Sequence, residues 1–100
     1  MPINSSQRRY LRSLAHPLDP VVRVGQAGLS EAVLAEADQA LTAHELIKVK
    51  LSVGDRTLRD ELVARLCARS TADLVQRIGQ VAVLYRPNPK KKQPLVLPRG

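Results

Sequence analysis

A Gly-x-x-G loop joins a short apolar run to a helical pattern, and this junction constrains the fold more than any other feature. The run Val21–Val24 is typical of a strand, and Ser30 is a good N-cap for a helix that we expect to extend to about Ala43. Residues 25–28, Gly-Gln-Ala-Gly, lie between them. Glycine has no Cβ, so a ligand can approach this backbone closely, and the N–H groups at a helix start favour a phosphate. A plain turn is the alternative interpretation.

Two more helices are indicated by apolar residues at helical spacing. The first covers Gln7–Ala15, with Ser5 or Ser6 as its N-cap, and the prolines that follow end it. The other begins after the N-cap Asp55, runs to about Arg69 and presents a stripe of leucine and valine for burial.

Three further strands complete the pattern. In Leu46–Val53 the apolar side chains alternate with Lys48 and Lys50, so the two lysines face away from the buried residues. Leu74–Ile78 and Val81–Tyr85 flank a Gly-Gln dipeptide, and glycine in its first position suits a type II′ hairpin turn. The predicted order is helix, strand, helix, strand, helix, strand, strand. This order indicates an α/β (α+β) fold in which helices pack on a sheet.

The basic residues are concentrated at the two ends of the chain, which carries a formal net charge of +7. Residues 1–18 and 74–100 contain no acidic residue, whereas residues 19–73 contain seven basic and nine acidic ones. A nucleic acid is the simplest partner, because its phosphates release counterions when they are neutralised. A basic protein with a disordered tail is the alternative. With only Tyr10 and Tyr85 as aromatic residues, we do not expect binding by aromatic stacking platforms.

The candidate RNA-binding residues are the loop and the cations near it and at the chain ends. The loop contributes Gly25, Gln26, Ala27 and Gly28, with Arg23 as the nearest cation. The other candidates are Arg8, Arg9, Arg12, Lys48, Lys50, Arg86, Lys90, Lys91 and Lys92. Lys48 and Lys50 could equally form a solvated strand face, and the lysine run at 90–92 could serve only solubility.

The length and composition exclude several other classes. One hundred residues make one domain, 1–87, followed by a basic Pro/Lys-rich tail, 88–100, that we expect to be flexible. The single cysteine excludes an internal disulfide and, with no apolar stretch of membrane-spanning length, favours a soluble, monomeric cytoplasmic protein. His16, His44 and Cys67 fit no compact metal-ligand spacing. We therefore expect no metal, no cofactor and no enzymatic activity.

Five sequence blocks together resemble the CRM domain family, whose name stands for chloroplast RNA splicing and ribosome maturation. They are similar above all to its bacterial single-domain YhbY-type members. The blocks occur in the family's order within about residues 7–87, and they are Leu14–Leu18, Pro20–Val22, Gly25–Ser30, His44–Lys50 and Val83–Pro87. The His-Glu-Leu-Ile-Lys-Val-Lys string of the fourth block is much more specific than the glycine loop.

The resemblance implies a four-stranded mixed sheet packed on helices, similar to the C-terminal domain of translation initiation factor three. It implies that the loop Gly25–Gly28 contacts RNA and that the partner is 23S rRNA in the precursor of the large (50S) ribosomal subunit. Many relatives carry a basic or more polar residue inside this loop, whereas Gln26 and Ala27 are uncharged. Loop contacts would then depend on backbone N–H groups. The alternatives are another structured-RNA binder or RNA chaperone, and a ribosome-associated protein-interaction module; a membrane-surface binder ranks last.

Overall fold

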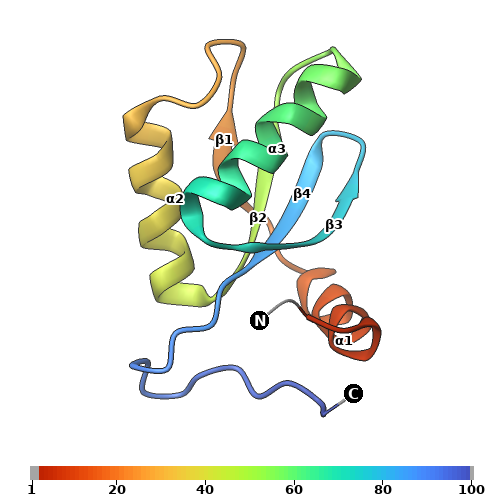
Figure 1. Cartoon of the computed structure of the whole chain (residues 1–100), viewed down its shortest axis with the longest axis vertical. Coiled ribbons are helices and arrows are strands. Elements are labelled where there is room, and N and C mark those ends of the chain that lie inside the picture. Colours follow the sequence, from red (N-terminus) through yellow and green to blue (C-terminus); the bar gives the residue numbers. More distant parts are fainter. Residues whose placement is uncertain (1–2, 100) are drawn as a thin grey trace.

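The computed structural model describes residues 3–99, which form three helices and a four-stranded sheet (Figure 1). The elements in chain order are α1 (Ser5–Ala15), β1 (Pro20–Val24), α2 (Glu31–His44), β2 (Leu46–Leu51), α3 (Arg56–Ser70), β3 (Asp73–Ile78) and β4 (Val81–Tyr85). The predicted order of elements and the mixed α/β fold are confirmed.

The sheet brings three loops to one end of the molecule. Its strand order is β1-β2-β4-β3, with β1 parallel to β2 and the other neighbours antiparallel. Because β1 and β2 are parallel, the loops that follow them lie at the same end. The N–H of Leu51 donates to the carbonyl of Gln80 at 2.7 Å, which places the β3–β4 turn there as well. We call residues 25–28, 52–55 and 79–80 the loop end; it lies at the top of Figure 1.

Side chains along β2 point alternately to the two faces of the sheet, and a separate hydrophobic cluster lies on each face. Ile47, Val49 and Leu51 are buried in the larger hydrophobic cluster, under α2 and α3. The opposite face carries Leu46, which is buried in a smaller cluster with residues of α1. Helix α1 covers only this part of the second face, so Lys48 and Lys50, farther along β2, remain half-buried. The predicted orientation of the two lysines is therefore confirmed.

The N-cap of α1 is Asn4, and the prediction of Ser5 or Ser6 was wrong. The Asn4 side chain accepts a hydrogen bond from the N–H of Gln7 at 2.8 Å, and the Gln7 side chain accepts one from the N–H of Asn4 at 3.1 Å. This reciprocal capping box starts the helix at Ser5, two residues before the predicted start.

The other local signals were read correctly, apart from the end of β2. Ser30 caps α2 and Asp55 caps α3, as predicted. Gly79 has φ +57° and is followed by a residue with ordinary φ, as a type II′ turn requires. Strand β2 ends at Leu51 and not at Val53, whose carbonyl accepts a hydrogen bond from the Arg59 side chain at 3.2 Å.

The C-terminal tail contains no helix or strand in its described part, but several contacts attach it to the domain. The N–H of Leu95 donates to the buried carboxylate of Glu45 at 3.1 Å, and the Gln7 side chain donates to the carbonyl of Pro98 at 3.0 Å. The side chains of Leu95 and Leu97 pack against the smaller cluster. Helix α1 and the C-terminal tail therefore lie side by side, at the opposite end of the molecule from the loop end (Figure 1).

These contacts predict that the tail contributes to stability. We expect Leu95→Ala to lower the free energy of unfolding by about 1 kcal/mol, because half-buried apolar surface is lost. Val96→Ala is the matched control, since the Val96 side chain is 79% exposed and should leave stability unchanged. Urea denaturation of both variants measures the difference, and equal small effects would show that the tail is detached in solution.

Candidate nucleic-acid interface

The Gly-x-x-G loop is a tight turn whose tip points into solvent. The N–H of Gly28 donates to the carbonyl of Gly25 at 3.0 Å. Gly28 has φ +81°, a conformation that favours glycine, and a Cβ there would lie 3.7 Å from a methyl group of Leu62. Gln26 and Ala27 are exposed at the tip, and their backbone N–H groups make no hydrogen bond within residues 3–99. Two donors are therefore available for a ligand.

The fold does not require a glycine at position 25. Gly25 is exposed, its φ lies outside the left-handed region, and a Cβ built on it would have no neighbour within 4 Å. Gly54, in the next loop of the loop end, has the same properties. An absent Cβ that neither strain nor packing explains leaves room for another molecule to approach the backbone.

A row of cations continues from this loop onto the open face of the sheet. Arg23 on β1 is exposed and is the register partner of Lys50 on β2. Lys48 lies two residues earlier on the same face, but its ammonium group donates to the carbonyl of His16, the C-cap of α1, at 3.1 Å. Arg23 and Lys50 have no such partner in the described chain.

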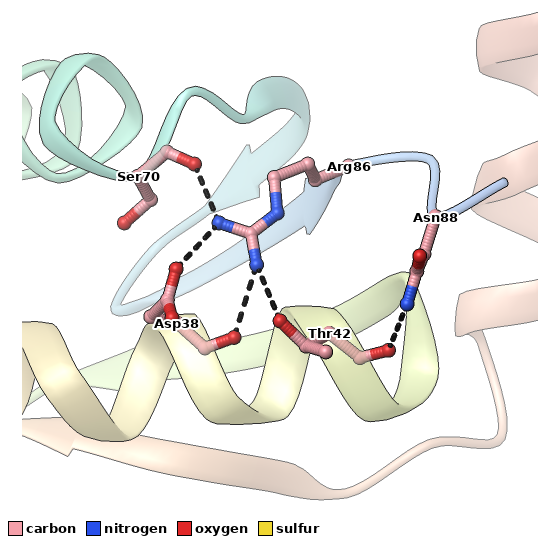
Figure 2. A network of polar contacts seen from close by, with 5 residues as sticks. All are labelled: Asp38, Thr42, Ser70, Arg86 and Asn88. Carbon is pink, nitrogen blue, oxygen red and sulfur yellow. Dashed lines mark hydrogen bonds and ion pairs between the residues drawn. The ribbon is translucent and has the colours of Figure 1, made fainter. Parts of the chain in front are cut away.

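Arg86 was predicted to bind RNA, but its guanidinium group is engaged within the protein (Figure 2). One terminal nitrogen donates to the carboxylate of Asp38 at 2.8 Å and to the carbonyl of Ser70 at 2.9 Å. The other donates to the carbonyl of Asp38 at 3.0 Å and to the hydroxyl of Thr42 at 2.9 Å. Only 19% of the Arg86 side chain is exposed. Arg86 thus joins the end of β4 to α2 and to the C-terminus of α3.

Two more of the predicted cations have protein partners. The Arg8 side chain donates to the carbonyls of Leu74 and Val75 on β3, and Lys91 lies 4.0 Å from the buried carboxylate of Glu45. The predicted cations whose charged groups have no partner in the described chain are Arg9, Arg12, Arg23, Lys50, Lys90 and Lys92.

The remaining titratable groups do not form a reactive site. Burial, with a smaller contribution from the Asp73 carboxylate, raises the pKa of the Cys67 thiol to about 11. Burial, followed by the charges of Glu45 and Asp73, also raises the pKa of Tyr85. Both groups are therefore protonated near neutral pH, and a protonated thiol is a poor nucleophile.

Across residues 3–99, no three His, Cys, Asp or Glu side chains are grouped as metal ligands would be. None of the helices described could cross a membrane.

The comparison with known proteins identifies the family. A protein-family model described as the CRS1 / YhbY (CRM) domain matches residues 3–86. The chain belongs to this family. It is 47% identical over 95 residues to "Probable RNA-binding protein PA4753" of Pseudomonas aeruginosa, covering 95% of this chain and 91% of that protein. It is 43% identical over 97 residues to an "RNA-binding protein" of Haemophilus influenzae, covering 97% of this chain and 96% of that protein.

A solved structure shares the fold. The solution structure of the hypothetical protein SAV1595 from Staphylococcus aureus matches with a TM-score of 0.82 and 36% sequence identity. The match covers 96% of this chain and 99% of that one. The predicted membership of the CRM family is therefore confirmed.

The sequence analysis missed two cations of this CRM domain. Arg56 and Arg65 on α3 are exposed and have no acidic partner in the described residues, and Arg65 lines a shallow pocket with Leu29, the first residue after the loop. The acidic residues of the central segment pair instead with other cations, for example Asp60 with Arg77 at 2.7 Å. The sequence did contain a signal, because Arg65 lies one helical turn after the apolar residue Leu62. Counting charges over the whole segment 19–73, in which acidic residues are in excess, hid these cations.

We predict that Arg86 and Lys92 have opposite roles in this CRM domain. Arg86→Met should lower the free energy of unfolding by about 1–2 kcal/mol, because four acceptors, among them the part-buried carbonyl of Ser70, lose a charged donor. Lys92→Met should leave stability unchanged and weaken RNA binding, since Lys92 is exposed. Urea denaturation and filter binding measure the two effects. If folded Arg86→Met protein bound RNA more weakly than Lys92→Met, Arg86 would belong to the interface.

Proposed function

We propose that this CRM domain is a non-enzymatic RNA-binding protein that binds 23S rRNA in the precursor of the large ribosomal subunit. The observation that carries the proposal is the Gly-x-x-G loop, which combines two free N–H donors with a glycine, Gly25, that the fold does not require. The names of the relatives support RNA as the partner. The ribosomal target rests on the resemblance to YhbY-type proteins. We propose that the protein acts as a monomer in the cytoplasm.

In this proposal, one RNA phosphate lies against the tip of the loop. The N–H groups of Gln26 and Ala27 donate to it, while Arg23 and Lys50 neutralise the next phosphates of the RNA chain. The start of α2 is a poorer position for the anion, because Glu31 places a carboxylate in the first turn. Its partner Arg69, at 3.7 Å, compensates that charge only in part.

A protein-interaction module is a second candidate, and one observation favours it. An apolar groove of about 440 Å³ lies at the end opposite the loop end, where Leu18 is 39% and Val21 is 48% exposed. Exposed apolar side chains around one groove are a common feature of protein contacts. Val21→Ser would impair such binding without changing affinity for RNA, whereas the RNA-binding proposal expects no role for this groove.

Electrostatic binding predicts a specific dependence on salt. The logarithm of the dissociation constant for a structured 23S rRNA fragment should rise linearly with the logarithm of the salt concentration. The double variant Arg23→Met, Lys50→Met should reduce the slope by about 1 to 2, because two phosphate contacts are lost. Filter binding over a series of KCl concentrations measures the slope. A flat response in the unmodified protein would contradict phosphate-driven binding.

A charge placed in the loop tests the contact directly. Gly25→Asp should weaken RNA binding by about 1–3 kcal/mol, through repulsion of the phosphate and loss of close approach. Position 25 is a better test than position 28, because a side chain there meets neither strain nor a neighbour. Gly25→Ala separates shape from charge, and Gln26→Lys should strengthen binding. If folded Gly25→Asp protein bound RNA like the unmodified protein, the loop would not be the contact.

The identity of the RNA requires a separate experiment. Crosslinking in cells, followed by sequencing of the bound RNA, should enrich fragments of 23S rRNA and its precursor with the unmodified protein but not with Gly25→Asp. Enrichment of transfer or messenger RNA instead would favour the alternative of a general structured-RNA binder or chaperone.

A further inference from the structure

A second cleft lies between α1 and the open face of the sheet. It has a volume of about 240 Å³, and Ile78, Val81 and Val83 form its apolar floor. Arg12 and His16 from α1 line one wall, and Lys48 and Gln76 also border it. No acidic side chain lines the cleft. Ile78 is 66% exposed, which is unusual for a large apolar residue on a strand and leaves the floor open to a ligand.

Strand register arranges the residues of this face in two adjacent rows. Gln76 on β3, Val83 on β4 and Lys48 on β2 form one row. In the next row, Ile78 and Val81 lie beside Lys50. Since neighbouring strands lie roughly 5 Å apart, about 10 Å separates β3 from β2. The face therefore presents an amide at one side, apolar surface in the middle and two ammonium groups at the other side.

This spatial arrangement of groups matches the base and the phosphate of a single nucleotide. A flat base can lie on Ile78 and Val81, and the Arg12 guanidinium, which has no partner in the described chain, can stack on its other face. The Gln76 side chain, which makes no hydrogen bond within residues 3–99, offers one donor group and one acceptor. An amide of this kind pairs with adenine through two hydrogen bonds. The phosphate would lie toward Lys50 and Lys48.

We propose that this cleft binds the base of one unpaired adenosine that protrudes from a structured RNA. The proposal rests on the proposed RNA-binding function and adds a point of base recognition to it. Arg23 follows Lys50 in the same row and is two residues before Gly25, so the phosphate path from the cleft leads to the Gly-x-x-G loop. A duplex alone would contact the loop and the lysines but leave the cleft empty.

Three RNA hairpins test this proposal. One is fully paired, one has a single bulged adenosine, and one has an abasic nucleotide at the bulge. The unmodified protein should bind the adenosine bulge about tenfold more tightly than either of the others, an effect of the size expected for one bidentate pair between an amide and adenine. The abasic hairpin keeps the bend of the RNA and removes only the base, so it separates base recognition from recognition of shape.

A variant pair assigns the effect to the cleft. Gln76→Leu keeps the size of the side chain but removes the amide, and it should abolish the preference for the bulge while leaving affinity for the paired hairpin unchanged. Gln39→Leu, at an exposed position on α2, is the matched control and should retain the preference. Thermal melts confirm that both variants fold.

The possible contrary results are distinguishable. Equal affinity for the adenosine and abasic hairpins, or a preference that survives Gln76→Leu, would overturn the proposed base site and leave the RNA-binding function intact. Binding to none of the three hairpins at low salt would overturn both proposals.

Discussion

Glu45 is a fully buried residue in a strained backbone conformation, and the arrangement of the domain depends on the contacts that hold it there. Its φ of +63° lies in a sparsely populated region that costs a non-glycine residue about 1–3 kcal/mol. The turn that this conformation makes ends α2 and starts β2 directly. Three hydrogen bonds hold this residue in place. Its N–H donates to the carbonyl of Leu41, its carbonyl accepts from the N–H of Arg86, and its carboxylate accepts from the N–H of Leu95. One residue thus joins a helix, the two central strands and the tail.

Arg86 completes this junction and explains why basic residues at one end of the molecule are not all available to RNA. Its guanidinium satisfies acceptors on α2 and α3, and the nearby Lys91 pairs with Glu45 (Figure 2). A guanidinium group can do this because its fixed fork of donors serves several acceptors at once. At the loop end, by contrast, Arg23 and Lys50 have no protein partner in the described chain. Tertiary contacts therefore engage Arg86 and Lys91 within the protein, whereas Arg23 and Lys50 on the sheet are left without a protein partner in the described residues.

The order of elements could be predicted from the sequence because it depends on local periodicity. Ser30 and Asp55 were correct as caps, whereas Asn4 was missed because its partner Gln7 was read as the first helical residue and not as half of a capping box. The contacts of the tail depend on Glu45, about fifty residues away, and no local pattern reports them. The Gly-x-x-G loop could be recognised as well, because it too is a local sequence pattern. Which cations remain free could not, because pairing is decided by tertiary contacts such as that between Asp38 and Arg86.

The scarcity of aromatic residues limits how the proposed RNA contact could distinguish one base from another. Tyr85 is buried in the smaller cluster, and Tyr10 lies on α1, so the described sheet presents no aromatic ring to solvent. Backbone N–H groups and cations fix the position of an RNA but carry no information about its sequence. Discrimination between bases would then rest on other groups, such as aliphatic surface, a guanidinium plane or a side-chain amide. In the described chain these three kinds of group meet at the cleft beside α1, where Ile78, Arg12 and Gln76 come together.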